Sequence, residues 1–152
     1  MARITQEEKG FLSLAGEFSV CAELLKRNIT AHITLGNQKA TDLLLLDKDK
    51  KSYVIEVKTS NTKRIVTSFF QKYGDKLKKH PDFWVLVQID DNTKHADFYI
   101  LTHQEMGDAQ MKRNKMSKWE PVTGCDNVLL NDLLEYKKDW NKIVNLLSID
   151  NK

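Results

Sequence analysis

Two acidic residues and one lysine occupy positions that suit phosphoryl chemistry. Asp42 precedes an apolar run, while Glu56 and Lys58 flank Val57 in a second run rich in β-branched and aromatic residues. If the two runs form a hairpin that turns at residues 48–50, the residue numbers of each facing pair add to 98. Asp42 then lies opposite Glu56. Opposed residues share one face of a sheet, with Cβ atoms about 4.5–5.5 Å apart, so two carboxylates meet there.

Two carboxylates at that separation repel each other unless a cation lies between them. Mg²⁺ takes carboxylate oxygens and keeps several of its waters, which suits such a pair, and we expect Mn²⁺ to substitute for it. Lys58 projects from the same face as Glu56, because side chains alternate along a strand. The pattern therefore indicates metal-assisted hydrolysis of a phosphodiester, with Lys58 orienting the nucleophile or the phosphate.

A third carboxylate belongs to the first predicted helix, which runs from about Gln6 to Arg27. Thr5 and Glu8 fit a capping box, and apolar residues follow at helical spacing. At about 100° per residue, Glu17 lies at the edge of this apolar arc, which comprises Phe11, Leu14, Phe18, Cys21, Ala22 and Leu25. If the helix packs on the hairpin, Glu17 reaches the Asp42 and Glu56 pair.

The remaining elements must hold these residues in place. Short β-rich runs separated by turn residues predict strands, and a proline after a polar segment predicts the end of a helix. The chain then closes with a helix whose apolar residues form one stripe. We predict strands at 31–35, 41–47, 52–59, 83–89 and 96–101, with helices at 68–79 and 132–147. The order α-β-β-β-α-β-β-α indicates one α/β domain over residues 1–152, built around a mixed sheet.

Gly16-Glu17, Thr41-Asp42 and Glu56-Val57-Lys58 together resemble the PD-(D/E)XK nuclease superfamily, over about residues 6–90. The resemblance implies a restriction-endonuclease-like α-β-β-β-α-β core, here with a C-terminal helix. It also implies that Glu17, Asp42 and Glu56 surround one or two Mg²⁺ ions, that the Val57 carbonyl is a further ligand, and that Lys58 assists the attacking water. Thr41 stands where the family name has proline, a frequent variation.

Within that superfamily, the long first helix, the glycine-containing loop at 36–39 and the short chain are similar to Holliday junction resolvases. Homing nucleases and the nuclease parts of restriction systems are similar too, and the sequence does not separate these classes. Because one chain carries one candidate site, cutting both strands of a duplex implies a symmetric homodimer.

Charge along the chain points to a polyanionic partner. Residues 48–80 carry a net charge of +7, residues 82–110 carry −5, and residues 112–118 carry +4. Such segregation can give a basic face that neutralises DNA phosphates. Gln38, Lys39, Lys63 and Arg64 flank the candidate site, and we expect them to contact DNA.

Other features narrow the class of protein. No apolar run approaches the about 20 residues that cross a bilayer, and the N-terminus lacks the apolar stretch of a secretory signal, so we expect a cytoplasmic protein. The four histidines lack the spacing of a metal motif. Two alternatives to a nuclease stay open: a nucleic-acid-binding module without chemistry, and an interaction domain whose acids and lysine form an ordinary salt-bridged sheet face.

Overall fold

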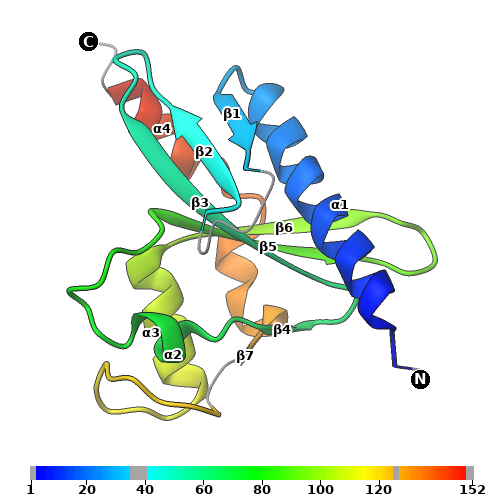
Figure 1. Cartoon of the computed structure of the whole chain (residues 1–152), viewed down its shortest axis with the longest axis vertical. Coiled ribbons are helices and arrows are strands. Elements are labelled where there is room, and N and C mark those ends of the chain that lie inside the picture. Colours follow the sequence, from blue (N-terminus) through cyan, green and yellow to red (C-terminus); the bar gives the residue numbers. More distant parts are fainter. Residues whose placement is uncertain (1–2, 35–40, 125–126, 150–152) are drawn as a thin grey trace.

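The structure, a computed structural model, describes residues 3–34, 41–124 and 127–149 (Figure 1). One long helix opens the described chain, four strands follow it, and shorter helices and further strands make up the rest. In chain order they are α1 (Gln6–Leu25), β1 (Thr30–Ile33), β2 (Leu43–Leu46), β3 (Ser52–Ser60), β4 (Arg64–Val66), α2 (Phe69–Tyr73), β5 (Phe83–Ile89), β6 (Ala96–Thr102), α3 (His103–Arg113), β7 (Asn127–Leu129), the 3₁₀ helix η1 (Leu130–Tyr136) and α4 (Asn141–Ile149).

The main sheet has five strands in the order β1-β2-β3-β5-β6, and only the β3–β5 pair is parallel. Leu43 pairs with Ile55 and Leu46 with Ser52, which confirms the predicted register. The sheet is therefore mixed, as predicted, and β3 lies at its centre between an antiparallel and a parallel neighbour. Strands β4 and β7 form a separate antiparallel pair.

Two apolar clusters lie on opposite faces of the main sheet. One face packs against α1 and α4 through Val20, Leu24 and Ile143. The other packs against α2, α3, η1 and the β4–β7 pair, through Phe69 and Met106 among others. Because side chains alternate along β3, residues such as Val57 point to the first cluster, and Glu56 points to the second. The helices flank the sheet in Figure 1.

Several predicted boundaries differ from the structure. The five strands and the first helix are confirmed within two or three residues. The helix predicted at 68–79 ends at Tyr73, with Gly74 as its C-cap. The helix predicted at 132–147 is two elements, η1 and α4, separated at Lys138, whose φ of 58° is left-handed and interrupts a helix. The helix α3 and the small β4–β7 sheet were not predicted.

The orientation of α1 also differs from the prediction. The predicted apolar arc faces solvent over most of its length, with Phe11, Leu14, Phe18 and Leu25 between 44% and 66% exposed. The helix instead packs on the sheet through another face, which carries Gly16, Val20 and Leu24. Helical periodicity marks apolar positions but does not say which of two faces is buried.

Candidate active site

Asp42 lies immediately before β2, at the point beyond which β3 has lost β2 as its partner and pairs only with β5. Its N–H donates to the carbonyl of Ile55 at 3.2 Å. Its Oδ2 accepts a hydrogen bond of 2.8 Å from the N–H of Val57. The carboxylate of Asp42 thus accepts the N–H of Val57, as a backbone carbonyl would if the β2–β3 pairing continued. This hydrogen bond holds the side chain of Asp42 beside the Glu56-Val57-Lys58 segment.

Glu56 is a buried carboxylate, 2% exposed, and its two oxygens have different partners. Oε2 accepts a hydrogen bond of 2.9 Å from the hydroxyl of Tyr73. Oε1 lies 3.0 Å from Nζ of Lys58 and 3.6 Å from Nζ of Lys72. Because burying a carboxyl group is costly unless it is paired or hydrogen-bonded, these contacts offset the cost of placing Glu56 at the centre of the sheet.

Lys58 is the electrostatic neighbour of all three candidate acids. It pairs with Glu56, and its charge also acts on Asp42 and Glu17. Burial raises the pKa of Asp42, the hydrogen bond from Val57 and the charge of Lys58 oppose that rise, and the nearby Glu56 adds to it. Burial likewise raises the pKa of Glu17, and Asp42 contributes by repulsion. One ammonium group therefore partly neutralises three acids.

Glu17 is brought close to Asp42 by an unusually close approach of α1 to β3. A Cβ atom at Gly16 would overlap the hydroxyl of Thr59 and lie 2.9 Å from its Cβ, so only glycine lets the helix pack at this distance. The same approach places Glu17 at the sheet surface. Glu17 and Glu56 nevertheless lie on opposite faces of β3, with Asp42 beyond the end of β2 as their common neighbour.

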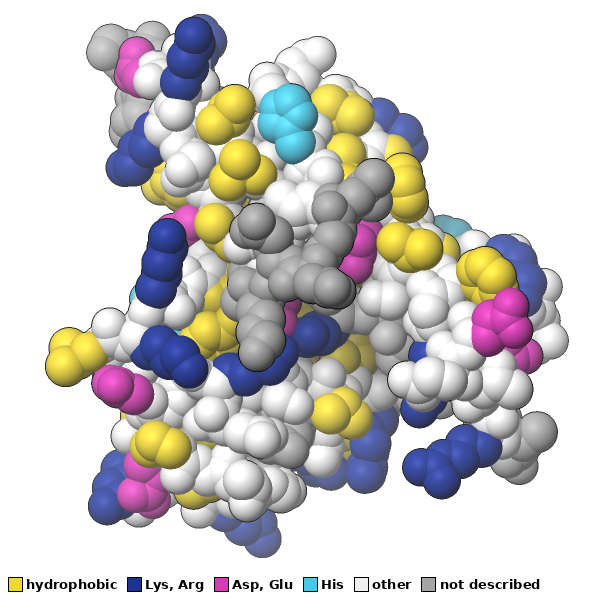
Figure 2. Space-filling view, in the orientation of Figure 1, with side chains coloured by type: hydrophobic (Ala, Val, Ile, Leu, Met, Phe, Trp, Pro, Cys, Tyr) yellow, Lys and Arg dark blue, Asp and Glu magenta, His cyan; other side chains and the backbone are white. Residues whose placement is uncertain are grey.

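A cleft of about 470 Å³ opens beside these residues, between α1, β3 and β4. The acids Glu17 and Asp42 line it on one side. Three basic side chains also line it, namely Lys9, Lys58 and Arg64. Figure 2 shows Lys and Arg side chains near the centre and at the left of the face in view. The cleft thus combines carboxylates with cations, a mixture that suits a phosphate ester and a metal ion together.

The oxygen donors here match the preferences of a hard divalent cation. Mg²⁺ sites commonly use one or two carboxylates plus waters and substrate phosphates, rather than a complete protein cage. Asp42 and Glu56 supply carboxylates of that kind beside one another, and the backbone carbonyl of Val57 stays a predicted further ligand. Among the described residues, no three His, Cys, Asp or Glu side chains gather closely enough to hold a metal between them. The part of Glu17 in a metal site stays a prediction.

The other predicted site residues divide into three cases. Arg64 is exposed and lines the cleft, and Lys63 is exposed next to it. Gln38 and Lys39 lie outside the described residues. Lys72 and Tyr73 were missed, because nothing in the polar segment that contains them indicates that the first turn after β4 brings them to Glu56.

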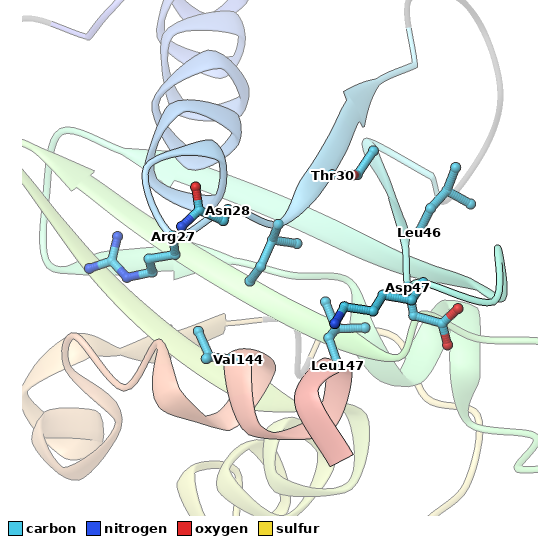
Figure 3. A pocket seen from close by; sticks show the side chains of 9 residues that line it. Arg27, Asn28, Thr30, Leu46, Asp47, Val144 and Leu147 are labelled. Carbon is cyan, nitrogen blue, oxygen red and sulfur yellow. The ribbon is translucent and has the colours of Figure 1, made fainter. Parts of the chain in front are cut away.

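A second hollow, of about 320 Å³, lies at the far end of α1, between the β1–β2 hairpin and α4 (Figure 3). Arg27 and Asp47 stand at opposite sides of it in Figure 3. Arg27 is bound to Glu23 at 2.7 Å and lies over the ring of Trp140. We assign this hollow to imperfect packing of α4 rather than to chemistry.

Comparison with solved structures shows that a known protein shares this fold. No protein-family model and no curated protein sequence matches the chain. Seven solved chains match it in structure. One is the bacterial homing endonuclease I-Ssp6803I, which is 12% identical; the match covers 92% of this chain and 94% of that one, with a TM-score of 0.56. At this identity the likeness shows a shared fold, a mixed sheet flanked by helices with a C-terminal helix.

None of the helices in the described part of the chain combines the length and the apolar character needed to cross a bilayer.

Proposed function

We propose that this chain is a metal-dependent endonuclease that hydrolyses phosphodiester bonds in DNA, with a site of the PD-(D/E)XK type. The observation that carries the proposal is the arrangement of Asp42, Glu56 and Lys58 at the start of β2, beside a cleft lined by acidic and basic side chains. The fold shared with a homing endonuclease supports it. A domain that only bound DNA would gain nothing from acidic groups that repel phosphate.

In this proposal, Asp42, Glu56 and the carbonyl of Val57 hold Mg²⁺, or Mn²⁺ in its place, with Glu17 as a further acid. When bound, the ion supplies Lewis-acid stabilisation of the charge that develops on the phosphate. Lys58 orients the attacking water or a phosphate oxygen and adds positive charge that matters most in the transition state. Lys63 and Arg64 contact phosphates, and so do Gln38 and Lys39 in the predicted loop.

The proposal is tested by incubating the protein with supercoiled plasmid, linear duplex, single strands and a four-way junction. We expect cleavage with Mg²⁺ or Mn²⁺, and binding with little turnover in Ca²⁺, because the larger ion tolerates looser geometry. Full activity in excess chelator would overturn the role of the metal. Absence of cleavage of all four substrates with either ion would favour the binding or interaction domain.

A pair of variants separates chemistry from docking. Lys58→Met should abolish turnover and leave DNA affinity in Ca²⁺ nearly unchanged, since its contribution is to the transition state. Replacing Lys63 and Arg64 together should weaken binding and lower the log–log salt slope by about one unit per lost phosphate contact. Lys78→Met, at an exposed lysine outside the cleft, is the control. Identical behaviour of the first two variants would contradict this division.

A further inference from the structure

The exposed face of α1 carries a row of large apolar side chains that the fold leaves uncovered. Phe11 is 66% exposed, Leu14 44%, Phe18 56% and Leu25 53%. Together with Ala15 and Ala22, which are also exposed, they define what we call the α1 stripe. Figure 2 shows hydrophobic side chains along the part of the surface where α1 runs in Figure 1, from the N-terminus at the lower right to β1 at the top.

The spacing of the α1 stripe is that of a helix–helix seam. Phe11, Phe18 and Leu25 are seven residues apart, and Leu14 lies three after the first of them. Side chains repeated in this way fall on one side of a helix and interdigitate with a second helix. At 1.5 Å per residue the row is about 21 Å long. Single exposed apolar residues are ordinary on a protein surface, whereas a continuous row marks an interaction site.

Charges at the two ends of α1 indicate which partner fits the stripe. Glu7 and Glu8 lie in the first turn, and Lys26 caps the other end, with its side chain 69% exposed and its Nζ 3.0 Å from Oε1 of Glu23. Glu7 and Lys26 both border the stripe at about 100° per residue. If a second α1 packs antiparallel, Glu7 of each helix meets Lys26 of the other, and the helix dipoles are also opposed favourably. A parallel arrangement would place like charges together.

We propose that the α1 stripe is the interface of a symmetric homodimer, in which two α1 helices pack antiparallel about a two-fold axis. A two-fold interface joins the same surface of both chains, and a row that is apolar in the middle and oppositely charged at its ends is self-complementary in that way. The proposal deepens the proposed function, because it names the surface that joins two cutting sites. It also places Glu17, which is on the flank of the same helix, near the symmetry axis.

The test measures molecular mass by sedimentation equilibrium, over protein concentrations up to about 100 μM, where even a modest interface is populated. We expect wild-type protein to be dimeric. Phe11→Gln with Phe18→Gln should weaken self-association at least about tenfold and change the thermal midpoint of the monomer little, because more than half of each side chain is exposed. Leu77→Gln with Leu134→Gln is the matched control, since both leucines are exposed outside the stripe.

A charge exchange tests the orientation. Glu7→Lys alone and Lys26→Glu alone should each weaken the dimer, and the two changes combined in one chain should restore it. Monomeric wild-type protein at every concentration would overturn the proposal, as would a dimer that the stripe variants leave intact. Because mass is measured without substrate, a protein that dimerises but cuts nothing would overturn the proposed function and leave this inference standing.

Discussion

At the scale of single residues, Asp42 is held where its negative charge is unfavourable. Burial raises its pKa and Glu56 repels it, so the fold is less stable once Asp42 ionises. Asp42→Asn removes the charge and keeps an oxygen that can accept from the N–H of Val57. Without metal we therefore expect the variant to be as stable as the wild type or slightly more stable.

With Mg²⁺ the order should reverse. Ligand binding to the native state stabilises the wild type by about 2.7 kcal/mol when free metal is 100 times the dissociation constant, and the variant should gain much less. Thermal melts of both proteins in chelator and in Mg²⁺ measure this. A strongly destabilised variant, together with melts that Mg²⁺ does not shift, would mean that Asp42 is a structural residue.

Tyr73 has a role at the same scale that is separate from metal binding. Its hydroxyl donates to Oε2 of Glu56, and both burial and the glutamate raise the pKa of the phenol, so it remains a donor at all working pH values. Tyr73→Phe should cost about 1–3 kcal/mol of unfolding free energy, because it leaves a buried carboxylate oxygen without its donor. Urea denaturation of the variant gives this number.

Lys72→Met provides the comparison for Tyr73→Phe. Lys72 lies 3.6 Å from the other oxygen of Glu56, but its side chain is 45% exposed, and exposed ion pairs contribute little. We therefore expect the lysine variant to lose less stability than the phenylalanine variant. An equal or larger loss in Lys72→Met would show that charge pairing, rather than the tyrosine hydrogen bond, keeps Glu56 in place.

At the scale of elements, the distance between α1 and β3 controls where Glu17 lies. A methyl group at Gly16 collides with Thr59, so Gly16→Ala must push the helix away from the sheet. Overpacking of this kind lowers the free energy of unfolding by about 1–3 kcal/mol. This loss exceeds the stabilisation that alanine provides over glycine through its higher helix propensity. Gly10→Ala is the matched control in the same helix, because nothing lies within 4 Å of its added Cβ.

We expect Gly10→Ala to raise the thermal midpoint slightly and leave cleavage unchanged, whereas Gly16→Ala should lower the midpoint and reduce cleavage. Parallel denaturation and nuclease assays of the two variants provide the check. If both variants behave alike, the close contact at Thr59 does not position Glu17.

Helix α1 shows which structural features could be predicted from the sequence and which could not. Its start was predicted because Thr5 and Glu8 form a capping box, which depends on neighbouring residues alone. Its docking face was predicted wrongly, because α1 has two apolar faces and the larger side chains are on the exposed one. Gly16 was the available signal, since a missing side chain permits close approach to a strand. A second capping box, Thr102 with Glu105, marks the start of the unpredicted helix α3.

The candidate site likewise contains residues that the sequence predicts and residues that it does not. Asp42, Glu56 and Lys58 could be predicted as neighbours because strand alternation and hairpin register are local rules, and the register is confirmed over Leu43–Leu46. Tyr73 and Lys72 belong to the connection between two parallel strands, whose path depends on packing over the sheet. No spacing rule relates those residues to Glu56, which is why the partners of this glutamate emerged only from the structure.

At the scale of the whole molecule, a buried histidine links stability to pH. His103 is 8% exposed, its Nδ1 accepts a hydrogen bond of 3.1 Å from Nε1 of Trp84, and His80 stacks on it. Burial, and secondarily His80, lower the pKa of His103 to about 4. The folded state therefore keeps His103 neutral at pH values at which the unfolded chain already binds a proton.

The contribution of neutral His103 to folding stability is fully present above about pH 6.5 and decreases as the pH falls toward 4. At pH 5 the loss should be about 2 kcal/mol relative to neutral pH, measured by urea denaturation. His103→Asn keeps an acceptor for Trp84 and does not titrate, so its stability should fall less steeply over this interval. If stability falls equally steeply with pH in the two proteins, His103 is not the source of the pH dependence.

The parallel pairing of β3 with β5 also sets the order in which the chain can fold. Strands β2 and β3 join through a short turn, but β5 reaches β3 only after a crossover that includes β4 and α2. Closing this longer loop comes at a greater entropic cost, so the crossover docks after the hairpin. Glu56 receives its partners Tyr73 and Lys72 from that crossover. A chain emerging from the ribosome therefore presents Asp42 and Glu56 before Tyr73 and Lys72 are available, and Glu56 gains these partners only once the crossover has docked.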